Sequence, residues 1–269
     1  MNRLDALRYS AGLLPEESDA GYALAYVLGI SKKEILAFPD RELTEAEEKK
    51  LDEIIRKRNE GIPLAYILGE WYFMDLVLKV DGSVLIPRQD TEVLCEAAIA
   101  YLKATGRRKV LDICTGSGCI ALSVKSAVPD AEVTASDISP TALKTASLNA
   151  EMNGLDIKLV CSDLFSRIGG KYDVITANPP YIPEKGFGDL PREIREHEPR
   201  LALVADEEGL GFYKRIAAAA KDRLLGRLFL EIGSDQAEAV TGLLKENGFR
   251  NITVSKDLAG NDRLVTADV

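Results

Sequence analysis

The amino-acid sequence predicts an α/β protein with a mostly parallel, doubly wound sheet, a small N-terminal helical bundle and a connecting β-hairpin. Three observations predict this fold. The first sixty residues carry helix start and stop signals, residues 63–88 switch to aromatic and alternating residues, and from residue 109 short apolar runs alternate with helical patterns. We therefore expect a helical domain at 1–65, a hairpin linker at 66–90 and a sheet domain at 91–269.

Two capping boxes, Ser31 to Glu34 and Thr44 to Glu47, predict helix starts in the first domain, because hydroxyl and carboxylate each satisfy an orphan backbone donor. Gly29 and Gly61 stand where helices end. In the linker, Asp81-Gly82 predicts a turn between strands at 76–80 and 84–86. None of these residues resembles a catalytic group.

The sheet domain shows the alternating βα pattern that produces parallel strands covered by helices on both faces. A loop at 260–262 predicts that the last two strands form an antiparallel end to the sheet. The predicted strands are 109–114, 132–137, 157–161, 173–177, 227–232, 250–256 and 263–267, and the predicted helices are 118–127, 140–153, 210–224 and 235–247.

Composition excludes several classes of protein. The chain has 269 residues, 46% of them hydrophobic, and a net charge of −9, which argues against binding nucleic acid through a general basic surface. The four cysteines form no Cys-x-x-Cys pair, so we expect reduced thiols and no metal site. With no signal peptide and no apolar segment of 18 residues, the sequence predicts a cytoplasmic protein without a membrane span.

The first strand of the sheet leads into a glycine-rich loop, Thr115-Gly116-Ser117-Gly118. Glycines allow a ligand to approach the backbone, and the following helix offers unpaired N–H groups. Asp137 ends the second strand, 21 residues after Gly116, where a carboxylate can accept from ribose hydroxyls. A nucleotide-like ligand is indicated, but the loop alone leaves a structural turn and an NAD enzyme open.

The fourth strand ends abruptly in Asn178-Pro179-Pro180-Tyr181. Two prolines make a stiff extended rim, and the first of them restricts Asn178 to extended backbone geometry. The Asn178 side-chain carbonyl, the Pro179 main-chain carbonyl and the Tyr181 ring could clamp a planar NH₂ group. Such a nitrogen is a poor nucleophile, so holding it in line with a methyl donor would be the useful work.

The segments VLDICTGSGCIALS, ASDISP and NPPYIP resemble the class I S-adenosylmethionine-dependent methyltransferases that modify planar nitrogens. Two upstream segments, GIPLAYILGEWYFMDLVLKV and VLIPRQDTEVL, look like the glutamine N5-methyltransferases of peptide chain release factors. The resemblance covers nearly the whole chain. It implies a Rossmann-like methyltransferase fold, S-adenosylmethionine as cofactor with S-adenosylhomocysteine as product, and release factors as protein substrates recognised by the helical domain.

The resemblance also implies residue roles. The loop of Cys114, Thr115, Gly116, Ser117 and Gly118 would wrap the methionine part of the cofactor, and Asp137 would hold the ribose. Asp163 and Leu164 would lie by the adenine, Arg88 and Thr91 would close over the site, and Asn178, Pro179, Pro180 and Tyr181 would clamp the glutamine amide. This sequence departs from the pattern at Cys114, where glycine is common, and at Leu164, where an aromatic residue is common.

Other interpretations remain open for several residues and for the chain. Asp112 could support the loop or only cap it, Asp163 could be an N-cap, and His197 is expected at the surface. An amino-methyltransferase of nucleic acid would use the same clamp on adenine or guanine, and a nicotinamide dehydrogenase or a non-catalytic binding module would use the same loop. We expect a monomer without stable nucleic-acid binding that methylates the glutamine of a Gly-Gly-Gln motif.

Overall fold

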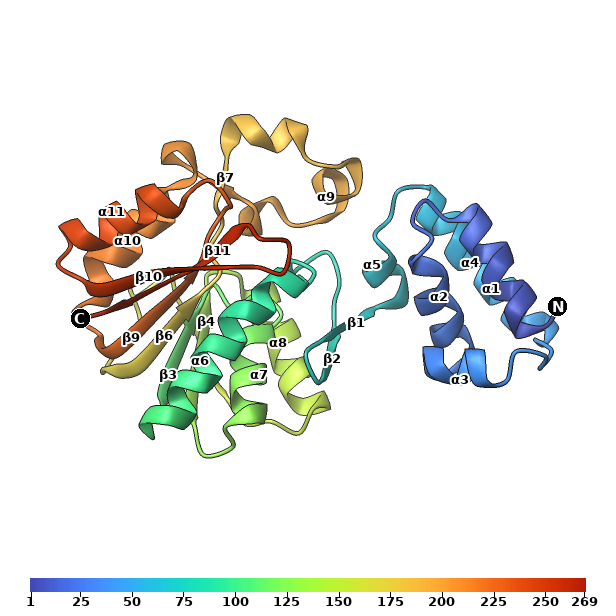
Figure 1. The fold of residues 1–269 in the computed structure, drawn as a ribbon, viewed down its shortest axis with the longest axis horizontal. Coiled ribbons are helices and arrows are strands. Elements are labelled where there is room, and N and C mark those ends of the chain that lie inside the picture. Colours follow the sequence, from blue (N-terminus) through green and yellow to red (C-terminus); the bar gives the residue numbers. More distant parts are fainter. The chain divides into compact units, whose positions relative to one another are not determined.

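A computed structural model describes all 269 residues, which divide into two compact units. The helical unit comprises residues 1–70 together with 191–197, and the sheet unit comprises residues 71–190 and 198–269 (Figure 1). The helical unit therefore includes a short segment that lies 120 residues downstream in the chain.

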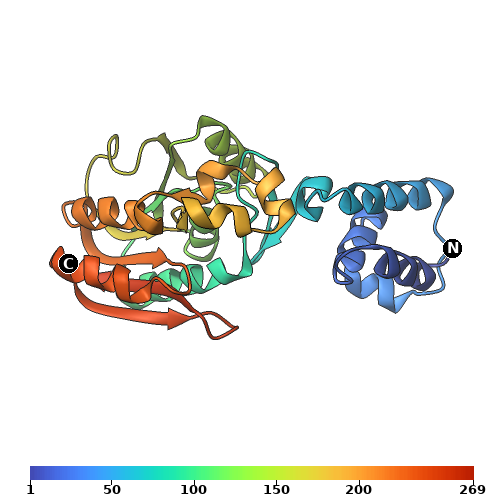
Figure 2. The same cartoon turned by 90° about the horizontal axis from the view of Figure 1, so that it is seen from above.

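The helical unit is built from short helices with defined ends (Figure 2). Both predicted capping boxes are confirmed, and Gly29 ends its helix in the left-handed conformation. The buried Arg58 at the end of α4 donates to Asp19 of α2 at 2.7 Å and pairs with Glu193 of α9. The helices are α1 (Arg3–Leu13), α2 (Asp19–Leu28), α3 (Lys32–Ala37), α4 (Glu45–Asn59), α5 (Leu64–Leu68) and α9 (Arg192–His197).

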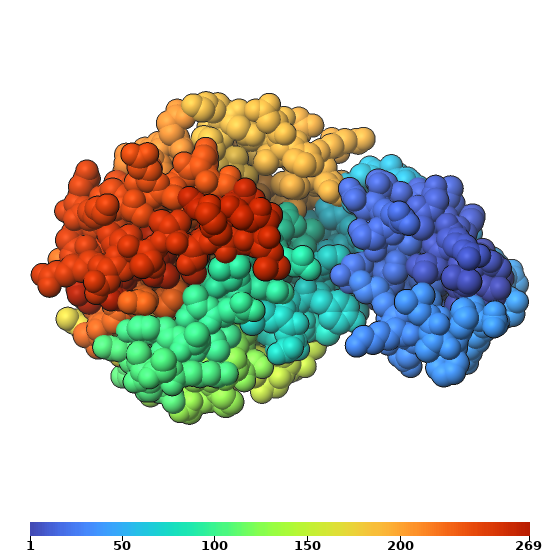
Figure 3. All heavy atoms as spheres, viewed as in Figure 1, coloured from blue at the N-terminus to red at the C-terminus, as the bar shows by residue number.

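A seven-stranded sheet forms the centre of the second unit, in the order β10-β11-β9-β6-β3-β4-β5. β3 pairs in parallel with β4 and β6, whereas β11 pairs antiparallel with β9 and β10, which confirms the predicted antiparallel end. In Figure 3 the red spheres of the C-terminal residues form part of the surface. The strands are β3 (Lys109–Ile113), β4 (Glu132–Asp137), β5 (Lys158–Cys161), β6 (Tyr172–Ala177), β9 (Leu224–Glu231), β10 (Arg250–Lys256) and β11 (Asp262–Asp268).

Helices cover both faces of this sheet because successive strand residues point to opposite faces. Val110 and Val174 pack with α6 and α7 on one face, and Leu111 and Ile175 pack with α10 and α11 on the other. This arrangement confirms the doubly wound prediction. The helices are α6 (Glu92–Thr105), α7 (Cys119–Ala127), α8 (Pro140–Met152), α10 (Gly211–Ala220) and α11 (Ala237–Glu246).

The predicted hairpin is wrong in its strand pairing. Its strands are β1 (Glu70–Phe73) and β2 (Leu76–Lys79), and the two-residue connection between them includes Met74 at a φ of 49°. Residues 84–86 form no strand, although Val84 and Ile86 are buried. A turn does follow Asp81, with the Val84 amide donating to its carbonyl at 3.1 Å, but the pairing partner of β2 lies upstream.

The segment between β6 and α10 contains only short elements, and no helix or strand was predicted there. Pro183 ends β7, which pairs in parallel with β8, and α9 lies between these two strands in the sequence. No helix in the structure combines the length and apolar character needed to cross a bilayer. The remaining elements are β7 (Ile182–Pro183), β8 (Val204–Ala205) and the 3₁₀ helices η1 (Gln89–Thr91), η2 (Glu184–Asp189), η3 (Arg200–Ala202) and η4 (Glu207–Gly209).

Candidate active site

A cavity of about 400 Å³ opens at the carboxyl ends of β3, β4 and β6 in the sheet unit. Most of the residues singled out in the sequence line it, whereas Gly118, Pro179 and Tyr181 do not. The three strands are parallel neighbours, so the residues that follow them meet at one edge. The predicted residues that line the cavity are Arg88, Thr91, Cys114, Thr115, Gly116, Ser117, Asp137, Asp163, Leu164, Asn178 and Pro180.

Asp112, a fully buried residue on β3, supports the glycine-rich loop through hydrogen bonds to its carboxyl group. The hydroxyl of Thr115 donates to its Oδ2 at 2.6 Å, and the hydroxyl of Thr176 on β6 donates to its Oδ1 at 2.7 Å. Burial raises the pKa of Asp112 to about 7, although these two hydroxyls oppose the rise. Asp112 therefore joins the loop to the neighbouring strand, which is the supporting role that the sequence left open.

Asp137 connects the end of β4 to the same loop. Its Oδ2 accepts from the Gly116 amide at 2.9 Å, and its Oδ1 accepts from the Ser139 amide at 2.9 Å. Burial raises the pKa of the Asp137 carboxyl, and these backbone donors oppose the rise. Each carboxylate oxygen has a second lone pair, so Asp137 can accept two further hydrogen bonds from a ligand in the cavity.

Two residues that depart from the family pattern both have left-handed backbone conformations. Cys114 has a φ of 58° and Leu164 a φ of 46°, a region that favours glycine because a side chain crowds the neighbouring carbonyl. The common glycine at the position of Cys114 thus has a backbone explanation. Leu164 is buried and lines the cavity, so it offers an apolar contact in place of an aromatic ring.

The conformation of Cys114 predicts an inverted order of stability for two small substitutions. The free energy of unfolding should be larger for Cys114→Gly than for Cys114→Ala, by roughly 0.5–1 kcal/mol. Glycine relieves the strain of the left-handed conformation, and this gain exceeds its entropy cost. The same pair at Cys95, inside α6, should show the ordinary order, with alanine more stable. Urea unfolding of the four variants measures this, and alanine being more stable at both positions would contradict the assigned conformation.

The segment after β6 is fixed by contacts to several distant elements. Pro179 and Pro180 are buried, and Asn178 Nδ2 donates to Thr91 Oγ1 at 3.3 Å. The Tyr181 carbonyl accepts from Gln236 Nε2 at 3.0 Å, while burial raises the pKa of the Tyr181 hydroxyl to about 12. The rim is therefore held on both sides of the prolines.

Gly209 lies directly against this rim. A Cβ at Gly209 would stand 2.3 Å from the Tyr181 carbonyl oxygen and 2.7 Å from Gln236 Nε2, and the residue has a φ of 85°. Only glycine fits such a close backbone approach. The residues after β8 therefore contribute to holding Tyr181.

Arg88 is positioned by a residue that the sequence analysis did not single out. The buried Glu198 pairs with the Arg88 guanidinium and also accepts from the Ile86 amide at 3.3 Å. Arg215, likewise not predicted, pairs with Asp163 at 2.6 Å, and both of these side chains line the cavity. The Asp163 side chain is thus engaged in an ion pair, and the predicted N-cap alternative finds no support in its contacts.

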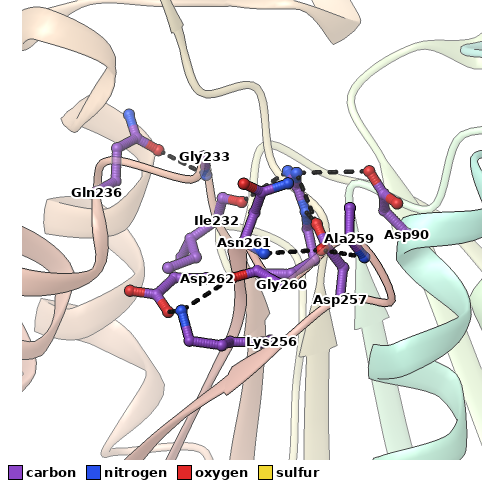
Figure 4. A network of polar contacts seen from close by, with 11 residues as sticks. Asp90, Ile232, Gly233, Gln236, Lys256, Asp257, Ala259, Gly260, Asn261 and Asp262 are labelled. Carbon is purple, nitrogen blue, oxygen red and sulfur yellow. Dashed lines mark hydrogen bonds and ion pairs between the residues drawn. The ribbon is translucent and has the colours of Figure 1, made fainter.

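A polar network links the hairpin formed by β10 and β11 to residues of the segments after β9 and before α6 (Figure 4). Arg263 donates to the Ile232 carbonyl at 3.1 Å and pairs with Asp257 at 3.2 Å and with Asp90 at 3.4 Å. Asp90 belongs to the segment that carries Arg88 and Thr91. The hairpin is therefore connected to the loop that lines the cavity.

Glu231 is a further residue that the sequence analysis missed. It is a buried acid at the end of β9, and burial raises its pKa to about 7. Its signal in the sequence is the same as that of Asp137, an acidic residue that ends an apolar strand. His197, by contrast, lies at the end of α9 in the helical unit and does not line the cavity.

Comparison with known proteins places these features in a family. Residues 91–192 match the family model "Methyltransferase small domain", and residues 9–69 match "PrmC N-terminal domain". The 16S rRNA N2 G1207 methyltransferase of Thermus thermophilus, solved with AdoMet and guanosine, is similar in fold, with a TM-score of 0.53 and 19% identity over 74% of this chain and 49% of that one.

Two curated relatives extend the similarity over nearly the whole chain. The release factor glutamine methyltransferase of Clostridium acetobutylicum is 37% identical over 98% of this chain and 97% of its own length. The corresponding protein of Moorella thermoacetica is 41% identical over 93% of this chain and 90% of its own. With both family domains matched in order and most of the predicted residues gathered at one cavity, the chain belongs to the family of release factor glutamine methyltransferases.

Proposed function

We propose that this protein transfers a methyl group from S-adenosylmethionine to the side-chain N5 atom of the glutamine in the Gly-Gly-Gln motif of peptide chain release factors. The observation that carries the proposal is a single cavity lined by Asn178 of the rim, Gly116 of the glycine loop and Asp137. The curated relatives named for this activity support the choice of substrate.

The residues of the cavity fit S-adenosylmethionine. Its volume lies within the roughly 300–1,000 Å³ typical of small-molecule sites. The loop 114–117 would hold the methionine part, Asp137 the ribose hydroxyls, and Asp163 with Leu164 the adenine. When bound, the cofactor supplies an electrophilic methyl group on a sulfonium ion.

The protein's own contribution is to bind and orient the glutamine amide. The Asn178 Oδ1 atom and the Pro179 main-chain carbonyl would accept the two amide hydrogens, and Tyr181 would border the amide plane. Of these three residues only Asn178 lines the cavity, so the other two contacts would form where the substrate amide extends beyond it. When both amide hydrogens are bound in this way, the glutamine nitrogen would point toward the methyl carbon of the cofactor. The nitrogen would gain one N–C bond as the bond between the methyl carbon and the sulfonium sulfur breaks, and it would lose one proton to solvent, so the products are a neutral secondary amide and S-adenosylhomocysteine.

The helical unit would recognise the release factor. Its surface exposes Leu36 and Phe38 at 64% and 63%, apolar side chains that a protein partner could cover. The net charge of −9 favours a protein over a nucleic-acid substrate. We further propose a monomer, and a cytoplasmic location follows from the proposed substrate because release factors act in translation.

Transfer of labelled methyl from S-adenosylmethionine tests the proposal. The acceptors would be a purified peptide chain release factor, the same factor with the Gly-Gly-Gln glutamine replaced by alanine, DNA, and ribosomal RNA. Label on the native factor alone is the expected result. Label on DNA or RNA alone would show that the rim clamps a base and would overturn the proposed substrate.

A further inference from the structure

The residues that line the cavity follow four strands that lie side by side in the order β6-β3-β4-β5. Asn178 follows β6, the glycine-rich loop follows β3 and Asp137 ends β4, so these groups succeed one another along a single edge of the sheet. Asp163 comes two residues after β5, at the far end of this row. A cofactor whose ribose binds at Asp137 and whose methyl group points toward Asn178 would therefore have its base beside Asp163.

Helix α10 supplies two further residues to this end of the cavity. Phe212 and Arg215 both line it, and they lie three positions apart, on one face of the helix. The Arg215 guanidinium lies over the Phe212 ring, 5.8 Å from its centroid. Phe212 also packs against the core cluster that contains the buried Leu164. Leu164 and Phe212 thus give the cavity an apolar lining of the kind that a flat base requires.

The ion pair between Arg215 and Asp163 lies in the open. Arg215 Nη2 donates to Asp163 Oδ1 at 2.6 Å, and the two side chains are 50% and 45% exposed. Ion pairs with this exposure contribute little to stability, so folding alone gives no strong reason for the pair. Its effect on geometry is larger, because it holds one oxygen of Asp163 and leaves Oδ2 available to accept from a ligand in the cavity.

We propose that Arg215 is a positioning residue that orients the Asp163 carboxylate toward the exocyclic amino group of the cofactor's adenine. A carboxylate only accepts hydrogen bonds, so it binds this amino group and finds no donor in a base that lacks one. Without Arg215 the Asp163 side chain would be free to turn into solvent. The inference rests on the proposed function, whose cofactor it places, and it concerns recognition of the base rather than of the methyl acceptor.

Calorimetric titration tests this role with two ligands, S-adenosylhomocysteine and its analogue in which hydrogen replaces the exocyclic amino group. The unmodified enzyme should bind S-adenosylhomocysteine about tenfold more tightly than the analogue, as expected for one hydrogen bond to a charged group. Arg215→Ala should reduce this preference to less than about threefold, because a mobile carboxylate gains less from the hydrogen bond. Arg215→Lys retains a cation that can pair with Asp163, so it should keep most of the preference.

The matched control is Lys214→Ala, on the neighbouring residue of α10. Lys214 pairs with Glu207 at a similar exposure, but it does not line the cavity. This variant should show the same preference for adenine as the unmodified enzyme. A preference that is unchanged in Arg215→Ala, or that falls equally in Lys214→Ala, would overturn the proposal.

A double-mutant cycle tests whether Arg215 acts through Asp163. Asp163→Ala should abolish the preference by itself. Adding Arg215→Ala should then reduce the preference no further, because the group that Arg215 orients is absent. Additive losses would show that Arg215 acts independently of Asp163 and would contradict the positioning role.

These titrations need no release factor, so they distinguish failure of this inference from failure of the proposed function. If the unmodified enzyme shows the predicted preference but transfers no methyl group to release factors, only the proposed substrate is contradicted. If it methylates release factors but binds the two ligands equally, only the role of Asp163 and Arg215 is contradicted.

Discussion

Replacing Asn178 by alanine is expected to lower kcat for release factor methylation about 10²- to 10³-fold, while S-adenosylhomocysteine affinity stays within about threefold. Asn178 is the one side chain of the rim that offers a carbonyl oxygen to the substrate, and removal of a single preorganised polar group from an active site typically has an effect of this size. The residue is only partly buried, so little stability should be lost.

Steady-state kinetics, calorimetry and thermal unfolding measure these three quantities separately. A matched control is Asn153→Ala at the end of α8, because Asn153 is equally part-buried and bonds to the Val77 carbonyl away from the cavity. That variant should keep its kcat. If Asn178→Ala retained more than a third of the activity, the amide clamp would have to be formed by main-chain carbonyls alone.

The second large effect is expected at Asp137, whose replacement by alanine should weaken S-adenosylhomocysteine binding on the order of 10²-fold. The substitution removes the proposed acceptor of two ribose hydroxyls, and hydrogen bonds to a charged group contribute roughly 1.5–3 kcal/mol each. It also leaves the amides of Gly116 and Ser139 without their acceptor, which should loosen the glycine loop.

Calorimetric titration measures the change, with Glu132→Ala as the control, since Glu132 lies exposed at the opposite end of β4. At saturating S-adenosylmethionine, Asp137→Ala should recover much of its kcat, because the substrate clamp is untouched. Binding that weakened less than threefold would mean that the cofactor is held by the loop backbone and not by this carboxylate.

The location of the site could be predicted because its main residues stand at the carboxyl ends of predicted strands. Asp137 and Asn178 each follow an apolar run, and an alternating βα pattern implies that the carboxyl ends of parallel strands meet at one edge. The predicted strands and helices of the sheet unit agree with the structure within a few residues at each end, but helix α6 (Glu92–Thr105) was not predicted. The hairpin was predicted less well, since alternating residues before and after β2 both fitted a partner strand.

The contacts that support the site could not be predicted in the same way. Glu198 reaches Arg88 across 110 positions of sequence, and Gln236 reaches the Tyr181 carbonyl across 55. Glu231 lies in a strand that was expected, but its approach to Asn178 depends on β6 and β9 being neighbours in the sheet. Periodicity reports only how a segment exposes its own faces, and it carries no information on which distant segment covers them.

The sequence by itself thus determined the α/β class, the cavity edge, the glycine loop and the extended Asn-Pro-Pro-Tyr segment proposed to bind the amide, because these depend on backbone rules and patterns within single segments. Only the tertiary structure decided that Asp112 joins the loop to β6, that Cys114 is held in a left-handed conformation, and that Asn178 bonds to Thr91. The physical reason is that hydrogen bonds and packing in a buried site are set by strand order and register, which bring together groups far apart in the chain.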